Sequence, residues 1–98
     1  MATFQEIIQD DKPVLVDFFA EWCGPCKTMA PELKKLVDMR GDSLRVIKVD
    51  VDRNPDAASH YGIQGVPTLI LFRKGAQLWR QSGAMTAAQL DRIIRDRI

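Results

Sequence analysis

The residues best suited to chemistry in this sequence are two cysteines, Cys23 and Cys26, separated by Gly24 and Pro25. They lie where a predicted strand ends and a predicted helix begins. Two residues three apart in a first helical turn are side-by-side neighbours, about 5–6 Å between Cβ atoms, and small adjustments bring that within disulfide geometry. A disulfide closing so small a loop removes little entropy from the unfolded chain. Its expected use is therefore reversible opening and closing.

The two cysteines differ in their predicted position on the helix. Cys23 stands at the helix N-terminus, where partial positive charge and unpaired N–H groups stabilise a thiolate, so we expect it to be the nucleophile. Cys26 lies one turn deeper and is expected to resolve the mixed disulfide formed on Cys23. The Gly24-Pro25 spacer supplies no cation to stabilise the reduced pair, which favours a pair that donates electrons.

Asp17 is the second candidate, because it interrupts an otherwise apolar strand over 14–19. A buried carboxyl has its pKa raised by desolvation, which suits it to taking the Cys26 proton during resolution. The alternative is a carboxylate at a strand end that reaches water. Lys48 in the next strand is a candidate partner for Asp17, and its alternative is a solvated lysine on the strand face.

Hydrophobic periodicity and turn residues predict the elements that position these side chains. The expected order is helix, strand, helix, strand, helix, strand, strand, helix. The segments begin with a short helix at Phe4 and continue with a strand over 14–19, a helix through about residue 39, a strand over 44–50, a helix over 55–61 with Asn54 as N-cap, strands over 68–72 and 77–82, and a helix after Thr86. Helix-joined strands predict parallel pairing and the final hairpin an antiparallel edge. The fold class is α/β, with three layers around a mixed four-stranded sheet.

Length and charge limit the number of domains and the kinds of partner that the chain can have. Ninety-eight residues predict a single domain over 1–98, and 14 basic against 13 acidic residues argue against nucleic acid as the main partner. The apolar runs are too short to cross a bilayer, and the first residues are acidic and amphipathic rather than secretory. We therefore expect a cytoplasmic protein. A zinc site usually needs four ligands, whereas the sequence offers only Cys23, Cys26 and the distant His60, so no metal is expected.

The chain resembles the thioredoxin family over roughly residues 14–98. The resemblance is carried by residues 16–27, Ala30-Pro31, Asp50-Val51-Asp52, Tyr61-Gly62-Ile63, residues 65–69, Gly75 and Gly83. It implies a thioredoxin fold and a general protein-disulfide reductase without a bound cofactor. The redox-active disulfide Cys23–Cys26 would be reduced again by an NADPH-dependent thioredoxin reductase, a flavoprotein. Implied clients include ribonucleotide reductase, peroxiredoxins and methionine sulfoxide reductases.

The resemblance also implies how clients bind. Only about 5–6% of X–Pro bonds in folded proteins are cis, so local frequencies alone favour a trans bond before Pro67. The family instead implies that Pro67 is cis and abuts the cysteines, and that backbone groups of Val66 pair with the client as an added strand. The other implied substrate-binding residues are Trp22, Gly24, Pro25, Gly65 and Gly83.

The chain departs from the family at its start, where residues 1–13 leave no room for the usual first strand. The strand over 44–50 is then a sheet edge, which invites association. We expect a monomer, with weak self-association through that edge as the alternative. Two other functions keep the fold: a binding module whose surface matters more than its thiols, and an oxidase or isomerase. The Gly24-Pro25 spacer and the acidic first residues argue against the oxidase.

Overall fold

A computed structural model describes residues 2–98, which form four helices, one 3-10 turn and four strands. The helices are α1 (Phe4–Ile8), α2 (Gly24–Arg40), α3 (Pro55–His60) and α4 (Ala87–Arg97), and η1 (Gly41–Ser43) is the 3-10 turn. The strands are β1 (Val14–Phe19), β2 (Arg45–Asp50), β3 (Thr68–Arg73) and β4 (Ala76–Ser82). The predicted order of elements is confirmed.

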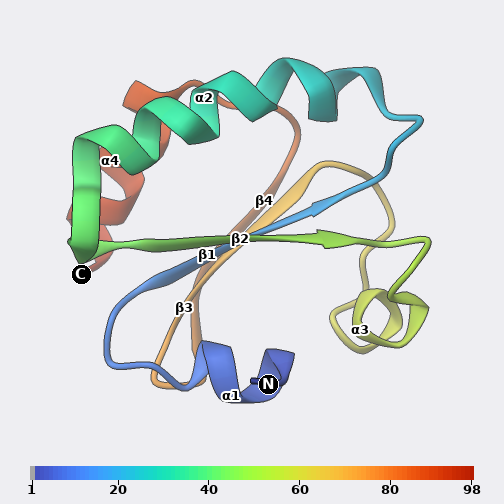
Figure 1. Ribbon diagram of the computed structural model, residues 1–98, viewed down its shortest axis with the longest axis horizontal. Coiled ribbons are helices and arrows are strands. Elements are labelled where there is room, and N and C mark those ends of the chain that lie inside the picture. Colours follow the sequence, from blue (N-terminus) through green and yellow to red (C-terminus); the bar gives the residue numbers. More distant parts are fainter. Residues whose placement is uncertain (1) are drawn as a thin grey trace.

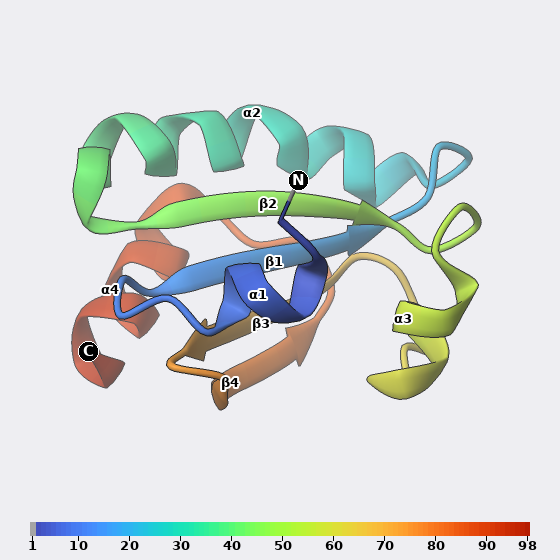
Figure 2. The same ribbon diagram turned by 60° about the horizontal axis from the view of Figure 1, so that its bottom comes forward.

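The strands form one sheet in the order β2-β1-β3-β4, which Figure 2 shows side by side. β1 pairs with β2 in parallel, as predicted for strands joined by a helix. The same expectation is wrong for β3, which pairs with β1 antiparallel. Phe18 is in register with both Val49 near the end of β2 and Thr68 at the start of β3. The connection carrying α3 therefore stays at one end of the sheet and does not cross back along it, so β3 must run the other way.

Helices cover both faces of the sheet, with α2 and α4 on one side and α1 and α3 on the other (Figure 1). Each face has its own apolar core. The core under α2 and α4 includes Leu15, Met29, Leu36, Leu71, Leu90 and Ile94. The core under α1 and α3 includes Ile8, Val16, Phe18, Ile70 and Phe72. The alternation along β1 sends odd residues to the first core and even residues to the second, so Asp17 lies on the α2 side.

Local signals explain most of the element ends. Thr86 and Gln89 form the complete capping box at the start of α4. Asn54 does precede α3, but its side chain makes no capping bond; its Nδ2 donates instead to the Asp50 carbonyl at 3.0 Å. The hairpin between β3 and β4 turns at Lys74 and Gly75, both with positive φ. Gly75 has φ +80°, a conformation that strains residues with a side chain, and an added Cβ would also displace the end of the Gln9 side chain, so glycine is favoured there.

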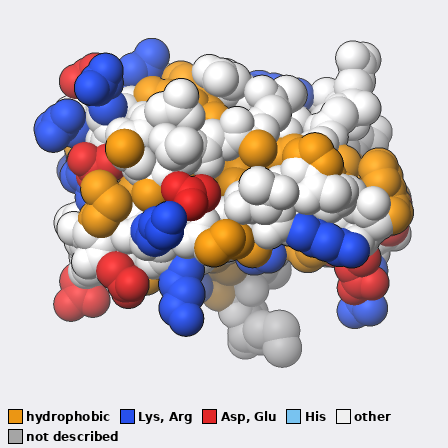
Figure 3. Space-filling view, turned by 90° about the horizontal axis from the view of Figure 1, so that it is seen from above, with side chains coloured by type: hydrophobic (Ala, Val, Ile, Leu, Met, Phe, Trp, Pro, Cys, Tyr) orange, Lys and Arg blue, Asp and Glu red, His pale blue; other side chains and the backbone are white. Residues whose placement is uncertain are grey.

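The surface over α2 mixes charges of both signs. Figure 3 views this face and shows Lys and Arg side chains interspersed with Asp and Glu. This mixture fits the near-zero net charge of +1. Among residues 2–98, the helices all fall short of the length and apolarity that a membrane span requires.

Candidate active site

Cys23 and Cys26 are joined by a disulfide at the start of α2, with their Cα atoms 5.3 Å apart. Cys23 is the N-cap residue of the helix, and its Sγ accepts a hydrogen bond from the backbone N–H of Cys26 at 3.1 Å. Pro25 occupies the first turn, where its missing N–H leaves no intrahelical bond unmade. The predicted position of Cys23 at a helix N-terminus is confirmed, and that N–H and the helix dipole would stabilise a thiolate there.

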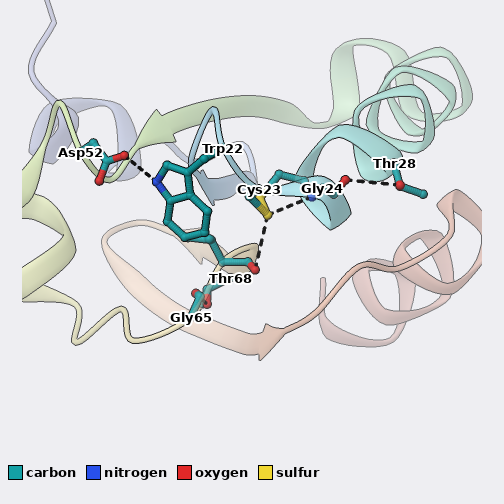
Figure 4. Close-up of a disulfide and its surroundings, with 9 residues drawn as sticks. Trp22, Cys23, Gly24, Thr28, Asp52, Gly65 and Thr68 are labelled. Carbon is teal, nitrogen blue, oxygen red and sulfur yellow. Dashed lines mark hydrogen bonds between the residues drawn. A yellow bond between two sulfur atoms is a disulfide. The ribbon is translucent and has the colours of Figure 1, made fainter.

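Trp22 stands beside the disulfide and is 71% exposed, the most exposed large apolar side chain among residues 2–98. Its indole Nε1 donates to Oδ2 of Asp52 at 2.9 Å, and Figure 4 shows the ring lying next to the Cys23 sulfur. The hydrogen bond holds a ring that few apolar contacts restrain. Asp52 therefore supports the site, although the sequence offered it only as part of a family landmark.

The loop before β3 brings backbone groups to the disulfide. The Val66–Pro67 peptide bond is cis, as the family resemblance implies and contrary to the trans bond that local frequencies favour. The Val66 carbonyl lies 3.6 Å from the Cys23 Sγ. The Gly83 N–H donates to the Pro67 carbonyl at 2.9 Å, which places the residue after β4 in the same region.

A shallow pocket of about 110 Å³ adjoins the disulfide on the Trp22 side. It is lined by Trp22, Val51, Ile63, Gln64, Gly65 and Val66. The residues that the sequence proposed for client binding thus come from four segments: the loop after β1, the first turn of α2, the loop before β3, and the residue after β4. The structure brings them together around Cys23.

Asp17 lies fully buried in β1, and neither of its carboxylate oxygens has a hydrogen-bond partner among residues 2–98. Burial raises the pKa of Asp17 from 3.8 to about 6, and the nearby charge of Lys48 opposes part of this rise. Lys48 is in register with Asp17, and its Nζ lies 4.6 Å from the centre of the Phe19 ring. The reading of Asp17 as a water-reaching carboxylate is wrong, because both neighbouring strands and α2 cover it.

Comparisons with known proteins identify the family. The family model described as Thioredoxin matches residues 1–96. The chain belongs to the thioredoxin family. It is 46% identical over 95 residues to a thioredoxin of Alicyclobacillus acidocaldarius, covering 97% of this chain and 90% of the relative. A thioredoxin of Acidithiobacillus ferridurans is 48% identical over 85 residues, covering 87% of this chain and 79% of the relative.

A solved structure shows the same fold. It is described as that of a malarial protein, superposes with a TM-score of 0.85 at 28% identity, and covers 89% of this chain and 98% of its own. The architecture of the thioredoxin fold is thus confirmed by an independent chain. The predicted three-layer α/β class with a mixed four-stranded sheet stands.

Membership of the thioredoxin family and the Cys23–Cys26 pair make the chain a thiol-disulfide oxidoreductase of the protein-disulfide reductase class. Thioredoxins carry no prosthetic group, and the redox-active pair is present here. Within the part of the chain that the structure describes, His, Cys, Asp and Glu side chains form no group of three or more that could hold a metal ion.

Sequence reasoning missed two supports of the loop before β3. The Thr68 hydroxyl donates to the Gly65 carbonyl at 2.6 Å, and the Arg80 guanidinium donates to the carbonyls of Tyr61 and Gly62. Thr68 lies within residues 65–69, which resemble the family, so a role for it in the site could have been inferred. Arg80 had no sequence signal, because it lies 18 residues from Gly62 and its partners are backbone atoms.

Proposed function

We propose that this member of the thioredoxin family is a general protein-disulfide reductase. The observation that carries the proposal is the placement of the Cys23 sulfur. It sits at the N-terminus of α2 beside the exposed Trp22 ring (Figure 4), and it lies 3.6 Å from the Val66 carbonyl. A nucleophile stabilised by a helix end and flanked by an open apolar surface suits attack on a disulfide in another polypeptide.

The proposed reaction has two exchange steps. The Cys23 thiolate attacks one client sulfur, a new S–S bond forms to Cys23, and the other client sulfur leaves as a thiolate that takes a proton from solvent. Cys26 then loses its proton and attacks the Cys23 sulfur. The second client sulfur leaves, and the Cys23–Cys26 disulfide remains. The client gains two electrons and two protons, and the cysteine pair is oxidised.

Asp17 is proposed to assist the second step. A carboxyl whose pKa is raised to about 6 by burial can hold or release a proton near neutral pH, which suits it to accept the proton of Cys26. Lys48 is proposed to support Asp17 through its charge, because that charge lowers the pKa of Asp17. The carboxylate form needed for proton acceptance is thereby populated at neutral pH.

Client binding is proposed to occur by strand addition at Val66, next to Cys23. The Val66 N–H makes no hydrogen bond within residues 2–98, which leaves it able to pair with a client backbone. Backbone pairing reads no particular side chain, and a shallow pocket adds apolar contact, so a broad clientele is expected. The residues assigned to this surface are Trp22, Gly24, Pro25, Gly65, Val66, Pro67 and Gly83.

The direction of electron flow suggests the surroundings in which the chain works. The Gly24-Pro25 spacer places no cation beside the cysteines, which favours electron donation and requires a supply of electrons. We propose that an NADPH-dependent thioredoxin reductase supplies them, that residues 1–98 act as one domain, and that the protein works in the cytoplasm. There it would take part in electron transport and redox homeostasis.

Insulin reduction in the presence of dithiothreitol tests the proposal. The wild-type protein is expected to raise the rate of insulin reduction, measured as the increase in turbidity, well above the rate with dithiothreitol alone. Cys23→Ser is expected to remove this effect. Cys26→Ser is expected to accumulate the mixed disulfide, visible as an adduct in mass spectrometry, because the resolving thiol is missing. Wild-type protein that does no better than dithiothreitol alone would contradict the reductase role. Activity that survives in Cys23→Ser would favour a binding module.

A further inference from the structure

Residues 61–67, called the client loop below, carry Val66 and Pro67 to the disulfide. The loop is anchored to the sheet at both ends by strand β4. We propose that Arg80 and Ser82 of β4 are positioning residues that hold the client loop in the conformation that pairs with a client backbone. This inference rests on the proposed function, because it takes Val66 as the client-pairing residue.

Arg80 anchors the start of the loop. Its guanidinium Nη2 donates to the Gly62 carbonyl at 2.9 Å, and its Nη1 donates to the Tyr61 carbonyl. Tyr61 is the C-cap residue of α3 and Gly62 follows it with φ +61°. A guanidinium with two donors in a fixed plane fits two successive carbonyls, and a cation is favourable at a helix C-terminus.

Ser82 anchors the end of the loop through Thr68. The hydroxyls of Ser82 and Thr68 are hydrogen-bonded at 2.9 Å, and the Thr68 hydroxyl donates to the Gly65 carbonyl at 2.6 Å. Since Thr68 gives its only proton to Gly65, the Ser82 hydroxyl must donate to Thr68. This relay orients the Thr68 hydroxyl toward the loop.

Both anchors act on the same side of the sheet. In β4, Arg80 is in register with Ile70 and Ser82 with Thr68, and residues two apart on a strand face the same way. Between the anchored carbonyls, Gln64 and Gly65 are exposed, and the N–H groups of Gln64, Gly65 and Val66 make no hydrogen bonds within residues 2–98. Together with the bond from the Gly83 N–H to the Pro67 carbonyl, the two anchors are the polar contacts that limit the loop's movement on its β4 side.

Loss of an anchor should change client binding more than redox chemistry. A polypeptide client must find Val66 already placed, because ordering the loop during binding weakens affinity. A small aromatic disulfide such as 5,5′-dithiobis-(2-nitrobenzoic acid) meets Cys23 without pairing with Val66. The helix end that stabilises the Cys23 thiolate belongs to α2 and does not depend on β4.

The test compares Arg80→Met and Ser82→Ala with Arg80→Lys, Ser82→Thr and wild type. Arg97→Met is the matched control, because Arg97 is exposed and its side chain makes no hydrogen bond or ion pair with residues 2–98. The KM for insulin is expected to rise about 3- to 10-fold in Arg80→Met with little change in kcat, and by a smaller factor in Ser82→Ala. Arg80→Lys is expected to bring KM only part of the way back to the wild-type value, since lysine lacks the planar fork. Ser82→Thr is expected to bring it most of the way back.

Two further readouts separate positioning from general destabilisation. The rate with the small aromatic disulfide and the Cys23–Cys26 reduction potential are expected to stay at wild-type values. Backbone order parameters from ¹⁵N relaxation are expected to fall at Gln64, Gly65 and Val66 in Arg80→Met and to stay unchanged at Leu69 and Ile70.

An unchanged KM together with unchanged order parameters in the loop would overturn the inference, as would equal losses for insulin and the small disulfide. If wild-type protein fails to reduce insulin, the proposed function falls, and the order parameters still decide whether β4 holds the loop. The two failures are therefore distinguishable.

Discussion

Asp17 is a carboxyl group that folding removes from water without giving it a hydrogen-bond partner. Its folded pKa of about 6 lies above the ordinary value of 3.8. Below pH 3.8 the group is neutral in both states. As pH rises from 3.8 to about 6, the unfolded chain releases the proton while the folded chain keeps it, so the free energy of unfolding falls. Above that range the loss is constant, at roughly 3 kcal/mol.

Replacing Asp17 with Asn therefore separates stability from activity. Asp17→Asn is expected to be more stable than wild type by roughly 3 kcal/mol at about pH 8 and nearly equal to it at about pH 4, measured by chemical denaturation. Turnover with insulin is expected to fall roughly ten-fold or more, while alkylation of Cys23 stays close to wild type. Asp38→Asn, on the exposed face of α2, is the control for loss of a negative charge. Unchanged turnover would remove Asp17 from the mechanism.

Helices α2 and α4 are joined by polar contacts as well as by their shared core. An oxygen of Glu32 in α2 accepts from the N–H of Ala87, the first residue of α4, at 2.9 Å, and this bond lowers the pKa of Glu32. Near the other end of α2, Arg40 donates from Nε to Asp91 Oδ1 at 2.7 Å and from Nη2 to the Asp91 carbonyl at 3.0 Å. The two contacts fix the position of α4 on α2, which carries the cysteines at its N-terminus.

The Arg40–Asp91 contact predicts a stability effect without a redox effect. Both side chains are mostly buried, at 15% and 20% exposure, so a charged partner left behind loses solvation as well as its hydrogen bonds. Arg40→Met is expected to lower the free energy of unfolding by about 1.5–3 kcal/mol in urea denaturation. The insulin rate at room temperature should match wild type, because the cysteines lie at the opposite end of α2. Arg92→Met, on the exposed side of α4, is the control, and an equal loss of stability there would contradict the assignment.

At the scale of the whole molecule, β2 is an edge strand of the sheet among residues 2–98, with one side of its backbone left unpaired. Arg45 and Val51 donate their N–H groups toward β1, to Pro13 and Phe19. Alternate residues point the other way, so the backbone groups of Val46 and Lys48 face outward without a partner strand. The exposed Lys48 side chain stands at the centre of this edge, and a lysine there resists pairing because its charge would lose water.

Light scattering tests how well that edge is protected. The wild-type chain is expected to keep the monomer mass of 11.1 kDa as its concentration rises. Lys48→Val is expected to raise the average mass with concentration, because the substitution leaves an apolar edge. Lys34→Val, at an exposed position on α2, adds the same side chain away from the edge and should stay monomeric. Wild-type protein that associates would show that one lysine is insufficient, and a monomeric Lys48→Val would show that other features protect the edge.

Local sequence patterns were sufficient to predict the helices, the strands and the position of the nucleophilic cysteine. The apolar run over 14–19, the capping residues Thr86 and Gln89, and the break at Gly24-Pro25 each act through neighbours a few residues away, so strand, helix and cysteine positions followed from them. The direction of β3 did not follow, because it depends on whether the α3 connection crosses the sheet. Asn54 is the N-cap residue of α3 as predicted, but the absence of a capping bond from its side chain, whose Nδ2 donates to the Asp50 carbonyl, did not follow from the sequence.

By itself, then, the sequence determined an α/β chain with a cysteine pair at a helix N-terminus, since helix geometry over three residues dictates that arrangement. Only the tertiary structure decided what surrounds the pair. The burial of Asp17 depends on two neighbouring strands and α2. Three further contacts join residues 18 to 43 positions apart: the Trp22–Asp52 hydrogen bond, the approach of the Val66 carbonyl to Cys23, and the hydrogen bonds from Arg80 to the client loop. Such contacts depend on how distant segments pack, and no local spacing encodes them.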